Sequence, residues 1–265
     1  MLEKTKEQER SFPIDEQDFM EKGEIVMYQT IFKRYELKYL LTKEQRDCLM
    51  EEMKPYMRLD GFGHTAIRNL YYDTTDYRLI RRSLEKPSYK EKLRIRSYHS
   101  ASEEDEVFVE IKKKYESVVY KRRVILPLHE AEEWLDEGQK CETEGQSYEQ
   151  KQIEGEIDYF LSYYKTLHPT MFLGYEREAF QPVCGGEFRI TLDEKIRYRT
   201  SDLSLGAGME GTSLLPENCT LMEIKTPGGI PLWMTHFLAN HKIRQVSFSK
   251  YGAAYQQMIR SKRGE

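Results

Sequence analysis

The sequence predicts an α+β domain in which one large antiparallel β-sheet carries peripheral helices. Three observations lead to this fold class. Seven segments alternate charged and apolar residues with a period of two, which is typical of strands with one polar face. Segments with helical spacing and capping signals lie between them. The length of 265 residues is enough for one large domain with its own core.

The alternating segments are the predicted strands. The first of them places Arg34, Glu36 and Lys38 on one face and apolar or aromatic side chains on the other. The other segments repeat this arrangement, with lysine, arginine or glutamate at every second position. The predicted strands are residues 34–39, 92–98, 107–114, 119–126, 171–179, 187–193 and 220–225.

The helices are predicted from caps and from apolar spacing. Thr42 and Gln45 form a capping box that starts a helix running to about Pro55, and Gly138 ends a helix over residues 128–137. Residues 1–25 are mostly charged, so we expect a flexible leader followed by one folded domain over residues 26–265. The other predicted helices are residues 76–85, 148–167, 231–241 and 249–260, and the predicted loops are residues 99–106, 138–147 and 200–219.

Composition excludes several classes of protein. With 41 Lys+Arg and 45 Asp+Glu the net charge is −4, so bulk charge does not favour binding to nucleic acid. The four cysteines have wide, irregular gaps, which predicts neither a zinc site nor a disulfide framework. No apolar run approaches the ~20 residues of a membrane span, and charges occupy the N-terminus where a signal peptide is apolar. We therefore expect a soluble cytoplasmic protein.

The polar faces of the predicted strands form an unusual set. Any one of them is explained as an ordinary solvated strand face, but seven together are better explained by a closed antiparallel barrel with a charged interior. The predicted inward cations are Lys38, Arg94, Arg96, Lys112, Lys121, Arg123, Arg177, Arg189 and Lys225. The predicted inward carboxylates are Glu36, Glu110 and Glu223.

Such a lining predicts a polyanionic ligand. Cations crowded in one lumen repel one another unless an anion lies among them. Arginine binds phosphate oxygens in a bidentate manner and lysine supplies a point charge, so a triphosphate or a longer phosphate chain fits. The sparse glutamates suit a divalent metal that bridges phosphates.

An ordered set of motifs carries a family resemblance. The chain resembles the catalytic domain of the vacuolar transporter chaperone (VTC) complex, a polyphosphate polymerase of the CYTH, or triphosphate tunnel metalloenzyme, superfamily. The resemblance covers about residues 28–256. The matching motifs are RYELKYLL at 34–41, NLYYDT at 69–74, KLRIRSY at 92–98, VEIKKK at 109–114, SVVYKRR at 117–123, GYEREAF at 174–180, FRITLD at 188–193, MEIK at 222–225 and SFSKY at 247–251.

The resemblance implies an eight-stranded tunnel in which the γ-phosphate of ATP is transferred to a growing polyphosphate chain. It implies that Glu223 is the main ligand of Mn²⁺ or Mg²⁺, with Glu36 and Glu110 as further candidates. Lys250 would point into the tunnel, and Tyr175 would lie beside the nucleotide, with Arg123 and Lys225 also assigned to nucleotide binding. The residues implied to hold phosphates are Lys38, Arg94, Arg96, Lys112, Lys121, Arg177 and Arg189.

Two departures from the family pattern bear on function. Many tunnel enzymes begin with Glu-x-Glu-x-Lys, whereas Arg34 takes the first position here, which disfavours the two-metal hydrolase and adenylyl-cyclase interpretations. The chain also shows no membrane span and no SPX-like helical domain, so we expect any membrane coupling to come from a separate membrane-protein partner. A triphosphatase and a non-catalytic polyphosphate-binding module remain as alternatives.

Several conspicuous residues are better explained by structure than by chemistry. We expect Asp73 and Asp76 to be turn residues, and Tyr251 and Trp233 to pack in the core. Alternation places Lys113 and Arg122 on the face opposite to the inward cations.

Overall fold

The computed structural model describes residues 35–116, 118–138 and 147–264. The predicted leader over residues 1–25, Arg34 and Cys141 lie outside the described residues. The strands are β1 (Tyr35–Thr42), β2 (Met57–Asp73), β3 (Tyr89–Ser97), β4 (Glu106–Tyr115), β5 (Val118–Pro127), β6 (His168–Pro182), β7 (Arg189–Arg199), β8 (Thr212–Ser213), β9 (Cys219–Thr226) and β10 (Gln245–Val246). The helices are α1 (Lys43–Glu52), α2 (Arg78–Leu84), α3 (Leu128–Glu137), α4 (Tyr148–Tyr164), α5 (Leu232–Asn240) and α6 (Lys250–Arg263).

The α+β class is confirmed, and each predicted strand and helix corresponds to an element of the structure within the described residues. Thr42 forms the predicted capping box with Gln45 at the start of α1. In the part of the chain that the structure describes, no helix is both long and apolar enough to span a membrane.

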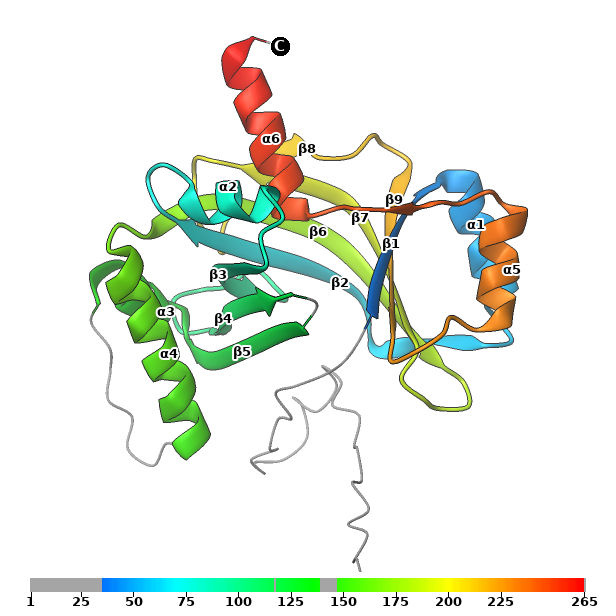
Figure 1. Ribbon diagram of the computed structural model, residues 1–265, viewed down its shortest axis with the longest axis horizontal. Helices are drawn as coiled ribbons and strands as arrows, with labels where there is room; N and C mark the ends of the chain where they lie inside the picture. Colours follow the sequence, from blue (N-terminus) through cyan, green and yellow to red (C-terminus); the bar gives the residue numbers. More distant parts are fainter. Residues whose placement is uncertain (1–34, 117, 139–146, 265) are drawn as a thin grey trace, which may run out of the picture.

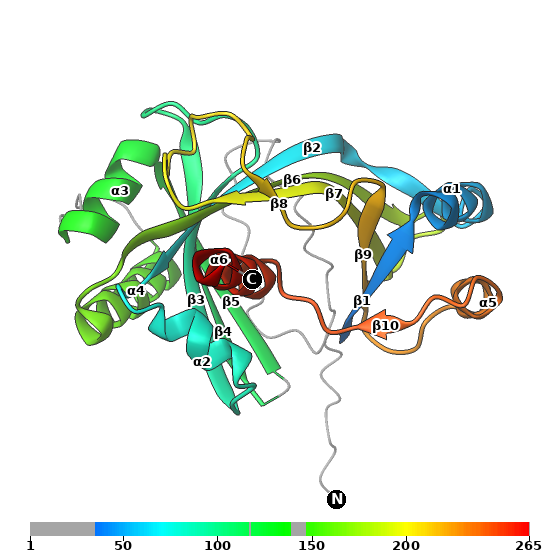
Figure 2. The ribbon, with the colours of Figure 1, turned by 90° about the horizontal axis from the view of Figure 1, so that it is seen from above.

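The prediction of a closed eight-stranded barrel is wrong. All the strands belong to one ten-stranded antiparallel sheet in the order β10-β1-β9-β7-β6-β2-β3-β4-β5, with β8 paired to β7. The edges β10 and β5 do not pair with each other. β10 contributes only two residues, and α6 begins between the β3–β5 side and the β1–β9 side of the sheet (Figures 1 and 2). A short edge strand and an inserted helix therefore replace the closing ladder.

The open sheet is nevertheless strongly curved, so strands that are not neighbours in the sheet approach each other across its concave face. Lys112 Nζ on β4 lies 4.0 Å from Glu36 Oε2 on β1. Lys92 Nζ on β3 donates to Ser249 Oγ at the start of α6 over 3.0 Å. The curvature therefore brings the polar faces of distant strands together without closing the barrel.

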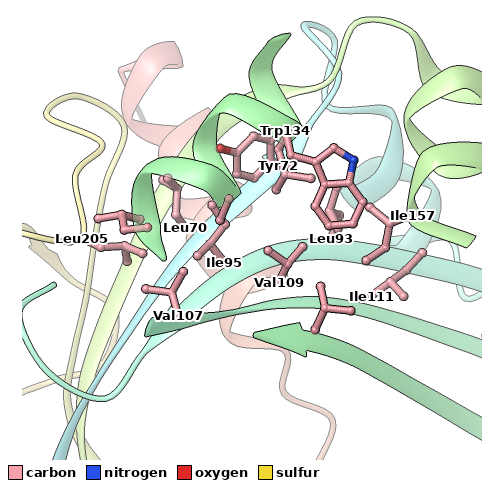
Figure 3. Packing of buried hydrophobic residues seen from close by; sticks show 14 of the residues in the cluster. Leu70, Tyr72, Leu93, Ile95, Val107, Val109, Ile111, Trp134, Ile157 and Leu205 are labelled. Atoms are coloured by element: carbon pink, nitrogen blue, oxygen red, sulfur yellow. The ribbon is translucent and has the colours of Figure 1, made fainter. Parts of the chain in front are cut away.

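The convex face of the sheet carries two apolar clusters. In the first, α3 and α4 cover β2–β5: Trp134 packs with Leu93, Ile111 and Ile157, all buried (Figure 3). The Trp134 indole donates to Asp158 Oδ1 over 2.7 Å, which joins the two helices. In the second cluster, α1 and α5 cover β1, β9, β7 and β6.

A third apolar cluster lies on the concave side, around α6. Tyr251, Ala254 and Met258 of α6 belong to it together with Tyr71 of β2 and Leu173 of β6. The first turn of α6 is fixed because Asp73 accepts hydrogen bonds from the Tyr251 hydroxyl (2.9 Å) and from two backbone amides of α2. Asp73 and Tyr251 are thus structural residues, as the sequence predicts, and they hold the N-terminus of α6 at the concave face.

Candidate phosphate-binding face

Strand register aligns the predicted inward residues on the concave face. In β1 and β9, Lys38 lies opposite Glu223 and Glu36 lies opposite Lys225, and Lys225 lies opposite Arg189 of β7. On the other side of the sheet, Arg94 lies opposite Glu110, and Lys112 lies between Lys92 and Lys121. Alternation alone therefore selected the correct face of each of these strands.

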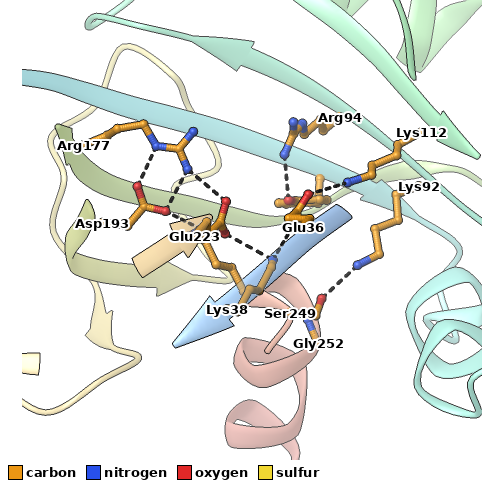
Figure 4. A network of polar contacts seen from close by, with 12 residues as sticks. Glu36, Lys38, Lys92, Arg94, Lys112, Arg177, Asp193, Glu223, Ser249 and Gly252 are labelled. Carbon is orange, nitrogen blue, oxygen red and sulfur yellow. Dashed lines mark hydrogen bonds and ion pairs between the residues drawn. The ribbon is translucent and has the colours of Figure 1, made fainter. Parts of the chain in front are cut away.

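One cluster of largely buried charges lies at the start of α6 (Figure 4). Arg177 donates to both carboxylate oxygens of Asp193, over 2.6 and 2.8 Å, and its Nη2 lies 3.5 Å from Glu223 Oε2. Lys250 Nζ contacts Asp193 Oδ2 at 2.5 Å and Glu223 Oε1 at 2.8 Å. Burial alone would raise the pKa of Glu223, but Lys250, Lys38 and Arg177 hold it well below its ordinary value.

Lys38 connects this cluster to the rim of the concave face. Its Nζ lies 3.2 Å from Glu223 Oε1 and 2.8 Å from Glu36 Oε1. Although burial opposes ionisation of Glu36, Lys112 and Lys38 lower its pKa to about 2. Two ionised carboxylates thus converge on one lysine ammonium.

A second cluster surrounds Glu110, which is 1% exposed. Arg94 contacts Glu110 Oε2 through Nε at 2.7 Å and through Nη2 at 2.5 Å, and Lys121 Nζ lies 2.9 Å from Oε1. Arg96 Nε lies 3.8 Å from Oε2 and also donates to Asn69. Burial opposes ionisation of Glu110, yet these cations hold its pKa well below its ordinary value.

Around Lys92 and Lys112 the environment disfavours the charged form, in contrast to the carboxylates described above. Burial, followed by the charges of Lys112, Lys38, Lys90 and Arg94, lowers the pKa of Lys92 to about 7. Burial also lowers the pKa of Lys112, although Glu36 partly offsets it. At the centre of the concave face, burial and neighbouring cations therefore disfavour the charged forms of both lysines, and Lys112 Nζ lies 4.0 Å from Glu36 Oε2.

The remaining predicted residues lie around these clusters. Tyr175 is buried beneath Arg177 and Lys250, whose charged groups lie 5.2 and 4.7 Å from its ring centre. Burial would raise the pKa of Tyr175, but Arg177, Arg96 and Lys250 lower it. Arg123 lies over the Phe108 ring, and Arg189 Nη1 donates to the Gly186 carbonyl.

Sequence reasoning missed three residues of the site. Asp193 and Lys92 lie on the polar faces of predicted strands, so alternation was the signal that could have found them. Ser249 contacts Lys92 only because α6 packs against the concave face, which local pattern does not reveal. In contrast, Lys113 and Arg122 are confirmed on the convex face, where both contact Glu156 of α4.

The predicted metal ligands lie in two different environments. Among the described residues, no group of three or more His, Cys, Asp and Glu side chains is placed to hold a metal ion. Glu36 and Glu223 converge, which fits a site of two carboxylates completed by phosphate oxygens, the usual arrangement for Mg²⁺. Glu110, in contrast, is 1% exposed and contacts Arg94, Arg96 and Lys121. Its position indicates a counter-ion for the arginines.

The chain belongs to the VTC domain family, whose model matches residues 33–259. The predicted family is therefore confirmed over most of the chain. No curated protein matches the sequence.

Solved structures support the fold. A crystal structure of a candidate adenylate cyclase from Bacillus halodurans matches with a TM-score of 0.50 and 16% identity, over 83% of this chain and 96% of that one. A candidate adenylyl cyclase from Hippeastrum, described as having a dominant triphosphatase activity, matches with a TM-score of 0.51 and 16% identity, over 86% and 96% of the two chains. At this identity the likeness concerns the fold alone.

Proposed function

We propose that this protein is a polyphosphate polymerase that transfers the γ-phosphate of ATP to the end of a growing polyphosphate chain. The observation that supports this function best is that Lys92 and Lys112 face each other across β3 and β4, with Arg94 next along β3. Burial and neighbouring cations lower the pKa of both lysines there. Phosphoryl transfer needs mainly positioning and charge neutralisation, and this surface supplies both.

Each cluster has a role in this proposal. Arg94 and Arg96 bind phosphate oxygens, and Glu110 holds both guanidiniums in place. Lys250 reaches the same region from α6, where Asp193 and Glu223 orient its ammonium group. Glu36 and Glu223 would hold Mn²⁺ or Mg²⁺. When bound, the metal would neutralise charge on the phosphates.

A triphosphatase is the second candidate, favoured by the activity described for the similar Hippeastrum protein. Both activities begin with a triphosphate bound to the same cations, and they differ in the acceptor. A hydrolase admits water, whereas a polymerase presents the terminal oxygen of another phosphate chain. A non-catalytic binding module would need the cations but no metal.

Analysis of the products separates these functions. Purified protein is incubated with ATP and Mn²⁺, with and without a short polyphosphate primer, and the products are resolved by gel electrophoresis and by an orthophosphate assay. We expect metal-dependent chains longer than triphosphate and a shorter lag with primer. Orthophosphate alone, even with primer, identifies the triphosphatase, and binding without turnover identifies the module.

Arg94→Ala and Arg96→Ala are each expected to lower the turnover of ATP at least tenfold, which corresponds to about 1.4 kcal/mol or more of transition-state stabilisation. Each substitution removes a guanidinium that can donate hydrogen bonds to phosphate oxygens. Steady-state kinetics checks this expectation, with Arg58→Ala, an exposed arginine near the start of β2, as the control. Turnover near the wild-type rate in either site variant would contradict the assigned role.

Tripolyphosphate affinity is expected to fall as the pH rises from 7 to 9. Lys92 attracts phosphate only when it is protonated. A bound anion raises the pKa of Lys92 above about 7, so binding takes up a proton between pH 7 and pH 9. Because one group takes up at most one proton, Lys92 can change the affinity for tripolyphosphate by at most about tenfold per pH unit. Calorimetry at several pH values checks it. Lys92→Arg, which stays charged, should show a flatter dependence, and equal slopes in the two proteins would contradict the assignment.

A further inference from the structure

The β3–β4 ladder contains a second lysine pair beyond the site described above. Lys92 lies opposite Lys112 inside the site, and the next same-face pair along the ladder is Lys90 opposite Lys114. Successive same-face positions on a strand are ~7 Å apart, so these two pairs form four cations in two adjacent rows. We call Lys90 and Lys114 the outer lysine pair.

Like charges directly opposite each other destabilise a sheet, so two consecutive lysine pairs work against the fold. Within the described residues, neither member of the outer lysine pair forms an ion pair with a carboxylate. Burial, and then the charges of Lys114 and Lys86, lower the pKa of Lys90. Lys86 is exposed in the segment between α2 and β3, so it extends the positive charge beyond the end of the ladder.

The outer lysine pair lies where β3 begins and β4 ends, on the same face as Lys92 and Lys112. A phosphate chain bound at Lys92 and Lys112 can therefore continue along the ladder and meet further cations at each step. A ligand of three phosphates has little need of this extension, but a polymer does.

We propose that the outer lysine pair, with Lys86, binds the part of a polyphosphate chain that extends beyond the site. This inference rests on the proposed function, because it assigns a track to the polymeric product or acceptor. The lysines of the track neutralise successive phosphates of the chain. This binding role explains why two consecutive lysine pairs, which destabilise the sheet, are present.

The test compares ligands of two lengths. Calorimetry measures the affinities of tripolyphosphate and of a long-chain polyphosphate for the wild-type protein and for the double variant Lys90→Gln/Lys114→Gln. The matched control is Lys43→Gln/Lys242→Gln, which removes the same charge from exposed positions on α1 and after α5. We expect the outer-pair variant to lose at least tenfold in affinity for the long chain and to stay within about twofold for tripolyphosphate, whereas the control stays within about twofold for both ligands.

The other outcomes overturn the track in distinct ways. Equal losses for both ligands would place the outer pair inside the triphosphate site. Unchanged affinity for the long chain, or an equal loss in the control, would leave the proposed function standing without the track. A wild-type protein that binds neither ligand would overturn the track and the proposed function together.

Discussion

Glu110→Ala is expected to lower the free energy of unfolding by about 3–5 kcal/mol, the usual effect of removing one partner from a buried ion pair. Glu110 is 1% exposed and compensates the charges of Arg94, Arg96 and Lys121. Without it, Arg94, Arg96 and Lys121 face one another with no carboxylate among them. Urea unfolding followed by circular dichroism measures the change.

Glu106→Ala provides the control, because Glu106 is exposed at the start of the same strand. We expect that variant to stay within about 0.5 kcal/mol of the wild type, as is usual for surface substitutions. A loss below 1 kcal/mol for Glu110→Ala would contradict the counter-ion role. A large loss of metal affinity with unchanged stability would restore Glu110 as a metal ligand.

Glu223→Gln is expected to lower metal-dependent turnover at least a hundredfold, or about 2.7 kcal/mol, while tripolyphosphate still binds. The amide keeps the shape of the side chain but loses the negative charge that attracts a divalent metal. The cations of the face remain, so the phosphate chain keeps its partners. Kinetics over a range of Mn²⁺ concentrations, together with calorimetry, separates the two effects.

Glu217→Gln is the matched control for this substitution, since Glu217 is exposed in the loop before β9. Its turnover should equal that of the wild type. Unchanged turnover in Glu223→Gln at limiting Mn²⁺ would contradict the assignment of Glu223 as a metal ligand. Loss of tripolyphosphate binding would instead show that Glu223 acts mainly by orienting Lys38 and Lys250.

Alternation predicted most of the sheet because most strands have one charged and one apolar face. It failed at β2, the longest strand. Gly63 adopts a φ of 61° there, and the register with β6 shifts between Leu59 and His64. From Ile67 to Asp73 the strand is largely buried on both faces, so its side chains no longer alternate in polarity.

Closure of the barrel could not be read from the strands themselves. Whether β5 reaches β1 depends on the short edge strand β10 and on α6, and both are placed by packing between distant segments. The same packing places Ser249 against Lys92. The identity of the charged residues was therefore predictable, whereas their grouping into separate clusters depends on the curvature of the folded sheet.

The most direct test of the phosphate-binding face is a crystal structure of the protein with tripolyphosphate and Mg²⁺. We expect phosphate oxygens within hydrogen-bond distance of Lys92, Lys112 and Arg94, and the metal between the phosphates and Glu223. Tripolyphosphate bound on the convex face, or bound outside the concave face with Lys92 still on Ser249, would contradict it.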